Sequence, residues 1–351
     1  MDEQELFQYF LEQEPFITDP EQDKLAFLDR GYFASCWSNE VHLFSRRLEQ
    51  TTINNLPQGK VPLIDDCFLS FLHPSITEAC VSVIDAKGNL HWYGRRATQP
   101  VQLWSGTKFL PIYYLLSQVD VEESPYEWWI RDVDNDRLFS FAALVDLVFT
   151  YIEGDNVSNS IALMFKSFFS PEELTRWLQK LTGNQDDIFR GGYGGPAFLA
   201  YPILQTKDAR EIMRGQHHHR GQNLVSVYAL TRALSELAWS DTKRNPDRYD
   251  LLIQGMAKDT ARYLDVALEH LSLSLSQVVI ISKMGFGRSE ERNRSELVYA
   301  ALLSSQELNI CLTFKTALNS HDPAQEARHL DARMATEVTK TVTALGHFYT
   351  L

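Results

Sequence analysis

The strand-like segments of this chain lie in two groups that are far apart in the sequence. The first group, 79–85 and 90–93, reads as a β-hairpin, because β-branched and aromatic residues flank a short glycine-containing turn. The second group comes near the end of the chain, at 278–281, 296–303 and 308–314. Strands from both ends can share one antiparallel sheet. The sequence therefore predicts an α/β fold of the α+β type, with helices flanking that sheet.

The long segment between the two groups has a mainly helical pattern, from about Ser124 to Ser274. An irregular stretch, 185–222, interrupts it. We expect residues 124–275 to form an all-helical lobe, and a cleft between this lobe and the sheet is a natural place for a site. Helices are predicted at 142–151, 156–169, 171–181, 224–239, 248–263 and 264–271.

The domain boundaries follow from the same pattern. Residues 76–123 and 276–351 are expected to form the α/β lobe around the sheet, with a closing amphipathic helix at 323–347. Residues 1–75 have a polar, amphipathic helical pattern. We therefore expect a helical N-terminal extension followed by one domain of two lobes, 76–351.

Charge and composition exclude several classes of partner. The net charge of −13 repels phosphate backbones and anionic lipid surfaces, so neither nucleic acid nor a membrane is expected as a partner. No long uncharged apolar run predicts a transmembrane helix. The acidic start of the chain lacks the pattern of a secretory signal, which favours a cytoplasmic location. The four cysteines show no Cys-x-x-Cys spacing, so we expect no metal site, and nothing in the sequence indicates a cofactor.

The strongest candidate site is Ser105 with Lys108. A serine hydroxyl needs a base to become a nucleophile, and a lysine buried in apolar surroundings has the lowered pKa that such a base requires. Ser-x-x-Lys spacing on a helix places both side chains on one face. A second copy, Ser240 with Lys243, lies among charges in a polar loop and reads as a solvated turn. Ser105 instead precedes a strongly apolar segment, although an ordinary helix cap beside a surface lysine would leave the same pattern.

Two further segments, taken in order with Ser105, resemble the three motifs of serine β-lactamases of class A and penicillin-binding proteins. Ser105 to Lys108 matches Ser-x-x-Lys. The segment 154–156, Gly-Asp-Asn, stands where Ser-Asp-Asn is expected, and 283–285, Lys-Met-Gly, stands where Lys-Thr-Gly or Lys-Ser-Gly is expected. The order of elements is also similar: hairpin, serine helix, helical domain, three strands, terminal helix. The resemblance covers about residue 79 to the C-terminus and marks the chain as a divergent member.

The resemblance implies a role for each matching residue. Ser105 would form an acyl-enzyme and Lys108 would activate it, while Asn156 and Lys283 would complete the catalytic set. The backbone N–H groups of Ser105 and Phe286 would form the oxyanion hole. Substrate-binding positions would be those at Gly154, Asp155, Met284 and Gly285.

Several departures from the family pattern affect the expected activity. Gly154 replaces the usual serine, with Ser158 one helical turn further on, and Met284 replaces the usual hydroxyl residue. No Glu-x-x-Leu-Asn pattern appears in 185–222, where class A enzymes carry the glutamate that activates the deacylating water. The acids in this stretch have no assigned role: Asp186, Asp187, Asp208 and Glu211.

Three hypotheses stay open. The first is a serine hydrolase that acts on a small-molecule or peptide-like amide or ester and is not an efficient β-lactamase. The second is an inactive descendant that binds a ligand in the same cleft, and the third is a glutaminase-like amidase. The sequence does not indicate an oligomeric state.

Other features have weaker functional interpretations. His217-His-His219 invites a metal site, but consecutive residues point in different directions and a solvated loop is the simpler interpretation. The glycines of 191–195 predict a flexible loop over the cleft. Trp104, Trp128 and Trp129 would either line a pocket or pack in the core. Arg288, Arg292 and Arg294 would either bind an anionic substrate or form a solvated turn.

Overall fold

The computed structural model describes residues 53, 56–57, 59–150, 155–239, 246–259, 261–270, 278–305, 308–319 and 323–349. Its main element is a five-stranded antiparallel sheet in the order β2-β1-β9-β8-β7. The first two strands are the hairpin β1 (Ile76–Ile84) and β2 (Leu90–Arg95). The other three are β7 (Val279–Ser289), β8 (Arg294–Ser304) and β9 (Asn309–Leu318). Because β1 pairs with β9, the two ends of the chain meet in one sheet, which confirms the predicted fold class.

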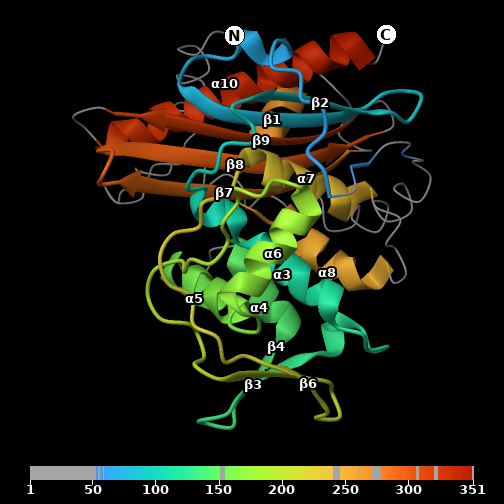
Figure 1. Ribbon diagram of the computed structural model, residues 1–351, viewed down its shortest axis with the longest axis vertical. Helices are drawn as coiled ribbons and strands as arrows, with labels where there is room; N and C mark the ends of the chain where they lie inside the picture. Colours follow the sequence, from blue (N-terminus) through green and yellow to red (C-terminus); the bar gives the residue numbers. More distant parts are fainter. Residues whose placement is uncertain are drawn as a thin grey trace.

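Each face of this sheet packs against a different set of helices (Figure 1). The helix α10 (Pro323–Tyr349) and the shorter α9 (Tyr263–His270) cover one face. The helix α7 (Val227–Trp239) packs on the other face, and all of its residues except Glu236 are buried. Successive side chains of a strand point to opposite faces of the sheet. A sheet that is covered on both faces therefore needs apolar residues at successive positions. The pocket described below lies on the α7 side.

The helical lobe lies on the α7 side of the sheet and contains short helices of ten to twelve residues. Local sequence sets some of their ends. Ser170 accepts a hydrogen bond from the Glu173 backbone N–H and starts α6, as its capping pattern predicts. Gly183 ends α6 at φ 76°, a conformation that glycine adopts readily. The helices are α3 (Phe109–Gln118), α4 (Phe141–Thr150), α5 (Asp155–Lys166), α6 (Pro171–Thr182) and α8 (Pro246–Ala257).

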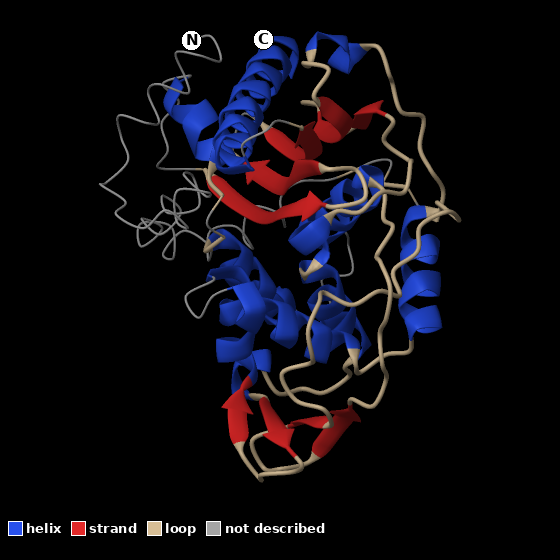
Figure 2. Cartoon of the chain, turned by 90° about the vertical axis from the view of Figure 1, so that its left-hand side faces the viewer, coloured by secondary structure: helices blue, strands red, loops and turns tan. Residues whose placement is uncertain are grey.

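The prediction of an all-helical lobe was wrong, because the lobe also carries a small antiparallel sheet in the order β4-β3-β5-β6. It lies at the end of the molecule farthest from α10 (Figure 2). Its strands are three or four residues long, too short to leave a recognisable alternation in the sequence. Their bounds are β3 (Trp129–Asp132), β4 (Leu138–Ser140), β5 (Pro202–Gln205) and β6 (Glu211–Arg214).

The irregular stretch is a loop that is closed at its base. Ile188 and Leu224 exchange backbone hydrogen bonds of 2.7 and 2.9 Å, so the chain leaves and returns at one point.

The predicted helix 248–263 is shorter in the structure: α8 ends at Ala257, and the next helix, α9, begins at Tyr263.

The predicted N-terminal helices fall in residues 1–52, outside the described ranges; between 59 and 75 the structure contains the 3₁₀ helix η3 (Phe68–Phe71). No helix among the described residues is both long and apolar enough to cross a membrane.

Candidate active site

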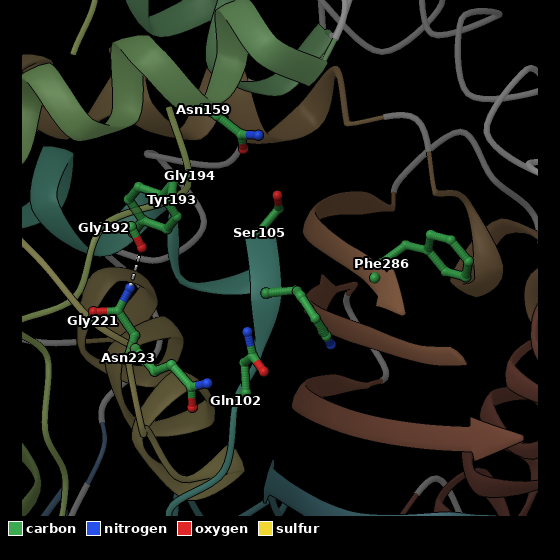
Figure 3. A pocket seen from close by; sticks show the side chains of 12 residues that line it. Gln102, Ser105, Asn159, Gly192, Tyr193, Gly194, Gly221, Asn223 and Phe286 are labelled. Carbon is green, nitrogen blue, oxygen red and sulfur yellow. Dashed lines mark hydrogen bonds between the residues drawn. The ribbon is translucent and has the colours of Figure 1, made fainter. Parts of the chain in front are cut away.

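A pocket of about 420 Å³ opens between the sheet and the helical lobe. Four parts of the chain contribute to it: the segment that contains Ser105, helix α5, the closed loop and strand β7 (Figure 3). The lining residues are Gln102, Trp104, Ser105, Asn159, Gly192, Tyr193, Gly194, Gly221, Gln222, Asn223, Phe286 and Gly287. Ser105 is therefore in the cleft that the sequence predicts.

Ser105 lies in the 3₁₀ helix η4 (Trp104–Thr107), directly before α3. Its side chain points into the pocket, towards the side on which Asn159 lies (Figure 3). Within the described residues its hydroxyl makes no hydrogen bond. The preceding residue, Trp104, has φ 47°, which is uncommon for a bulky residue and is found where surrounding structure enforces it. A free serine hydroxyl is thus presented at a sharp turn.

Two glycines of β7 allow η4 to approach the sheet edge closely. A Cβ atom at Gly285 would lie 2.5 Å from the Gly106 backbone nitrogen and 2.9 Å from that of Ser105. A Cβ atom at Gly287 would lie 2.4 Å from the Trp104 ring. Any side chain at these positions would push η4 away. Gly285 thus acts through its missing side chain and does not itself line the pocket.

The edge position of β7 determines where its backbone N–H groups point. The Met284 N–H donates to the Asp259 carboxylate at 2.9 Å, away from the neighbouring strand β8. N–H groups two residues apart on a strand point the same way, so the Phe286 N–H faces the same open edge, where η4 packs. The Phe286 ring points away from the pocket and packs with the core on the α10 side. Only its backbone is therefore offered to a ligand.

Lys108 is fully buried under the pocket. Its Nζ donates to the Ser158 hydroxyl at 2.8 Å, and this hydroxyl donates to the Val148 carbonyl at 2.9 Å. No hydrogen bond joins Lys108 to Ser105, since the Ser105 hydroxyl has none within the described residues. Lys108 and Ser105 are nevertheless one turn apart along the chain, as the spacing predicts. Ser158 is thus a hydrogen-bond partner of Lys108.

The structure places the middle motif differently from the resemblance. Asn156 is exposed and contributes neither to the pocket nor to Lys108. Gly154 and the Asp155 side chain lie outside the described residues. On the same helix, Ser158 reaches Lys108 and Asn159 lines the pocket. The reason is periodicity: α5 starts at Asp155, so the residues one turn further along the helix face the cleft.

The third motif also differs from the expected arrangement. Lys283 is fully buried, does not line the pocket, and pairs with the equally buried Asp259 at 3.2 Å. Asp259 further accepts hydrogen bonds from the Ser282 hydroxyl and the Met284 backbone. The Met284 side chain lies in the core on the α10 side, because alternate residues of a strand point to opposite faces. Asp259 is a partner of Lys283 that sequence reasoning missed.

The closed loop is held by a buried lysine on α5. Lys166 Nζ donates to the carbonyls of Phe189 at 3.2 Å and Gly191 at 2.6 Å, and to Asn223 Oδ1 at 2.9 Å. Asn223 in turn accepts from the Gly191 N–H and donates to the Gly192 carbonyl. Burial lowers the pKa of Lys166 well below its usual value. This network fixes the glycine-rich part of the loop against the pocket.

None of the four unassigned acids of the loop lines the pocket. Asp187 is fully buried at the loop base and accepts from the Ser226 backbone N–H at 2.6 Å and from the Ser226 hydroxyl at 3.2 Å. Burial raises its pKa to about 7, although the bonds from Ser226 act in the opposite direction. Asp186, Asp208 and Glu211 are exposed.

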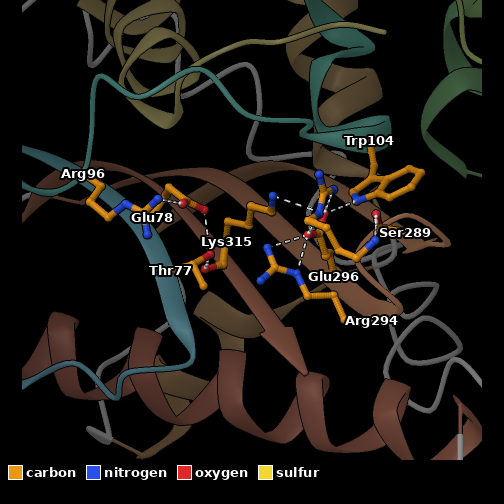
Figure 4. A network of polar contacts seen from close by, with 9 residues as sticks. Thr77, Glu78, Arg96, Trp104, Ser289, Arg294, Glu296 and Lys315 are labelled. Atoms are coloured by element: carbon orange, nitrogen blue, oxygen red, sulfur yellow. Dashed lines mark hydrogen bonds and ion pairs between the residues drawn. The ribbon is translucent and has the colours of Figure 1, made fainter. Parts of the chain in front are cut away.

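A buried ionic network holds the Trp104 side of the pocket (Figure 4). Glu296 accepts from Trp104 Nε1 at 3.1 Å and pairs with Lys315 at 3.1 Å. Arg292 and Arg294 reach its other oxygen at 2.9 and 2.8 Å. Burial by itself raises the pKa of Glu296, but these cations outweigh it and the pKa is lowered. Arg292 and Arg294, which we expected to bind an anionic substrate or solvent, therefore bind a carboxylate of the protein. Arg288 pairs with a different carboxylate, that of Glu326.

The remaining candidates are structural or lie apart from the pocket. Trp128 is buried in the core, and Trp129 belongs to β3. His219 is buried against two backbone carbonyls, and the only cluster of possible metal ligands among the described residues contains no histidine. Sequence reasoning missed the lining residues Gln102, Asn159, Tyr193 and Gln222. Polar residues of this kind leave no periodic signal, and only their convergence identifies them.

Comparisons with known proteins give matches among solved structures alone. No protein-family model and no curated protein matches the chain. A β-lactamase from Burkholderia vietnamiensis is 18% identical, with 77% of this chain and 93% of that chain covered, at a TM-score of 0.47. The class A β-lactamase from Mycobacterium abscessus is 15% identical, with coverages of 79% and 98% and a TM-score of 0.48. The chromosome-encoded β-lactamase of Vibrio parahaemolyticus is 13% identical, with coverages of 77% and 95% and a TM-score of 0.48. At identities this low, the chemistry has to be derived from the chain's own residues.

Proposed function

We propose that this protein is a serine hydrolase that cleaves an amide or ester through an acyl-enzyme on Ser105. The observation that carries the proposal is the position of the Ser105 hydroxyl. It is free, it points into a pocket, and it lies at a strand edge with an outward backbone N–H. Acyl transfer requires a nucleophile next to backbone N–H groups that can bind the oxyanion.

The proposed reaction has two half-steps. The Ser105 oxygen attacks the substrate carbonyl carbon, and the amine of Lys108, which a hydrogen bond to Ser158 holds in place, takes up the hydroxyl proton. The carbonyl oxygen becomes an oxyanion that accepts from the backbone N–H groups of Ser105 and Phe286. When the tetrahedral intermediate collapses, the bond to the leaving group breaks and that group receives the proton. Water then adds to the ester on Ser105 and releases the acid.

The second half-step is expected to be slow. No carboxylate or histidine among the described residues lines the pocket, so no obvious base activates the water. The buried Asp187 is engaged by Ser226, at the loop base. We therefore expect the acyl-enzyme to accumulate, which argues against efficient β-lactam hydrolysis.

Labelling of Ser105 tests the proposal. Full-length protein is treated with a fluorophosphonate and with penicillin-type probes, and intact mass and peptide mapping report adducts. Wild type should gain one probe mass on Ser105, and Ser105→Ala should gain none. The matched control is Ser240→Ala, in the second Ser-x-x-Lys copy, which should label like wild type. Equal labelling of wild type and Ser105→Ala would refute a nucleophilic Ser105.

A second candidate function is ligand binding without turnover. The buried Lys283–Asp259 pair favours it, because the charge that the resemblance assigns to the cleft is already neutralised by the protein. This alternative predicts that ligands saturate the pocket equally in wild type and in Ser105→Ala, with no covalent adduct in either.

A further inference from the structure

The polar groups that face the pocket are uncharged. Its lining side chains include four carboxamides, those of Gln102, Asn159, Gln222 and Asn223, and no lysine, arginine, histidine, aspartate or glutamate among the described residues. The one titratable side chain is that of Tyr193. Burial raises the pKa of Tyr193, although a hydrogen bond from Thr107 lowers it, so its hydroxyl is neutral near pH 7.

Three of the four carboxamides are available to a ligand. Asn223 is committed to the loop network through both of its side-chain atoms. Within the described residues, the side chains of Gln102, Asn159 and Gln222 make no hydrogen bond. Each offers both an acceptor oxygen and a donor NH₂ group. They surround the free hydroxyl of Ser105.

Three buried lysines on the elements that form the pocket are bound by protein acceptors. Lys166 is hydrogen-bonded to Phe189, Gly191 and Asn223. Lys283 is paired with Asp259. Lys108 is fully buried and donates to Ser158.

A cluster of cations next to Trp104, outside the pocket lining, is also bound by a protein carboxylate. Arg292, Arg294 and Lys315 converge on Glu296, which also holds the Trp104 indole. An anion that used these cations would have to displace a buried carboxylate, which would be left without its partners. The net charge of −13 adds a weak long-range repulsion of anions.

We propose that the pocket selects uncharged, hydrogen-bonding substrates, in which a carboxamide or peptide amide stands where a carboxylate would otherwise lie. This inference rests on the proposed function for its chemistry, and it adds the substrate class. A carboxylate entering the pocket would lose water and gain no cation among the residues that line it, whereas a carboxamide would exchange water for matched donors and acceptors. Free glutamine, with its α-carboxylate and α-ammonium, is disfavoured for the same reason.

A matched pair of esters tests the proposal. The p-nitrophenyl monoester of adipic acid and that of adipamic acid differ only in a terminal carboxylate or carboxamide. The kcat/KM for p-nitrophenol release should be at least about tenfold higher for the carboxamide ester than for the carboxylate ester. The difference should persist at both low and high salt, because salt screens only the long-range repulsion between the protein and the carboxylate. Equal rates, or a preference for the carboxylate, would overturn the proposal.

A cation placed at the rim of the pocket should weaken the preference for the carboxamide. Gln222→Lys adds a cation at the exposed rim and should raise kcat/KM for the carboxylate ester relative to the carboxamide by about tenfold or more. Gln216→Lys adds the same charge to an exposed site of the loop outside the pocket lining and should leave the ratio unchanged. Equal shifts in both variants would show that net charge, rather than the pocket, sets the preference.

Binding separates this proposal from the proposed function. The N-methylamides of the same two acyl groups are titrated into Ser105→Ala by calorimetry. Tighter binding of the carboxamide without Ser105-dependent ester cleavage would refute the hydrolase and leave the selectivity intact. Ser105-dependent cleavage with no preference in either assay would refute the selectivity alone.

Discussion

At the scale of single residues, the decisive contact is that between Lys108 and Ser158. The Ser-x-x-Lys spacing identifies Lys108 as a partner of Ser105, and in the structure its amine donates a hydrogen bond to Ser158, at 2.8 Å. Ser158 is itself anchored to the Val148 carbonyl at 2.9 Å. A general base must be held in the right position to accept a proton, and Ser158 contributes to holding Lys108.

The first prediction therefore concerns Ser158. The variant Ser158→Ala should slow acylation of Ser105 by about 10²- to 10⁴-fold, the usual range for lost general acid–base assistance, with little change in ligand affinity. Stopped-flow measurement of probe acylation checks this. Ser117→Ala, the same substitution on the exposed end of α3, serves as the control. Acylation within twofold of wild type in Ser158→Ala would exclude a role for Ser158 in positioning the base.

At the scale of elements, the site depends on how closely η4 approaches the edge of β7. The close contacts at Gly285 are with backbone atoms of Leu103, Ser105 and Gly106, which have no rotamer with which to yield. The glycine thus fixes the distance between the nucleophile and the strand that offers the Phe286 N–H. Met284, beside it, serves the core on the other face of the sheet.

The second prediction is that Gly285→Ala reduces both activity and stability. Overpacking of this kind costs about 1–3 kcal/mol in free energy of unfolding, and the displaced Ser105 should be acylated at least tenfold more slowly. Urea denaturation and probe kinetics measure the two effects. The matched control is Gly346→Ala in α10, where an added Cβ meets nothing within 4 Å and where the better helix propensity of alanine should stabilise by about 0.5–1 kcal/mol.

At the scale of the whole molecule, the loop joins both lobes around the pocket, and its base contains a buried acid. The pKa of Asp187 is raised by burial to about 7 in the folded state, against about 4 for an unfolded aspartate. The folded state therefore binds more protons between these values, and this group's contribution to stability falls as pH rises from about 4 to 7. His219 acts in the opposite direction: burial lowers its pKa to about 4, so its contribution falls as pH drops from about 6.5 to 4.

The third prediction separates the two groups. Asp187→Asn should gain stability relative to wild type as pH rises from 4 to 7, by roughly 3–4 kcal/mol in total, since one pKa unit corresponds to about 1.4 kcal/mol. Urea unfolding at pH 4.5, 6 and 7.5 measures the difference. Asp134→Asn, at an exposed site, should follow wild type at every pH. A constant difference between Asp187→Asn and wild type would show that Asp187 does not titrate in this range.

The sequence was sufficient wherever a signal was long or local. The five strands of the main sheet, most helices and the α6 cap were predictable, because they rest on periodicity and on a hydroxyl beside an N–H three residues away. The small sheet was missed because its strands are only three or four residues long. The partnership of Lys283 with Asp259 was missed because it joins residues that no local pattern relates.

By itself, the sequence determined which residues could carry chemistry: a serine and a lysine one turn apart before an apolar helix, and a glycine-spaced strand near the end of the chain. Only the tertiary structure decided which of them meet. It turned Asn156 outwards, brought Ser158 to Lys108, and gathered neutral carboxamides around Ser105. The physical reason is that a helix or strand fixes the direction of each side chain, but the packing of elements distant in sequence determines what that side chain faces.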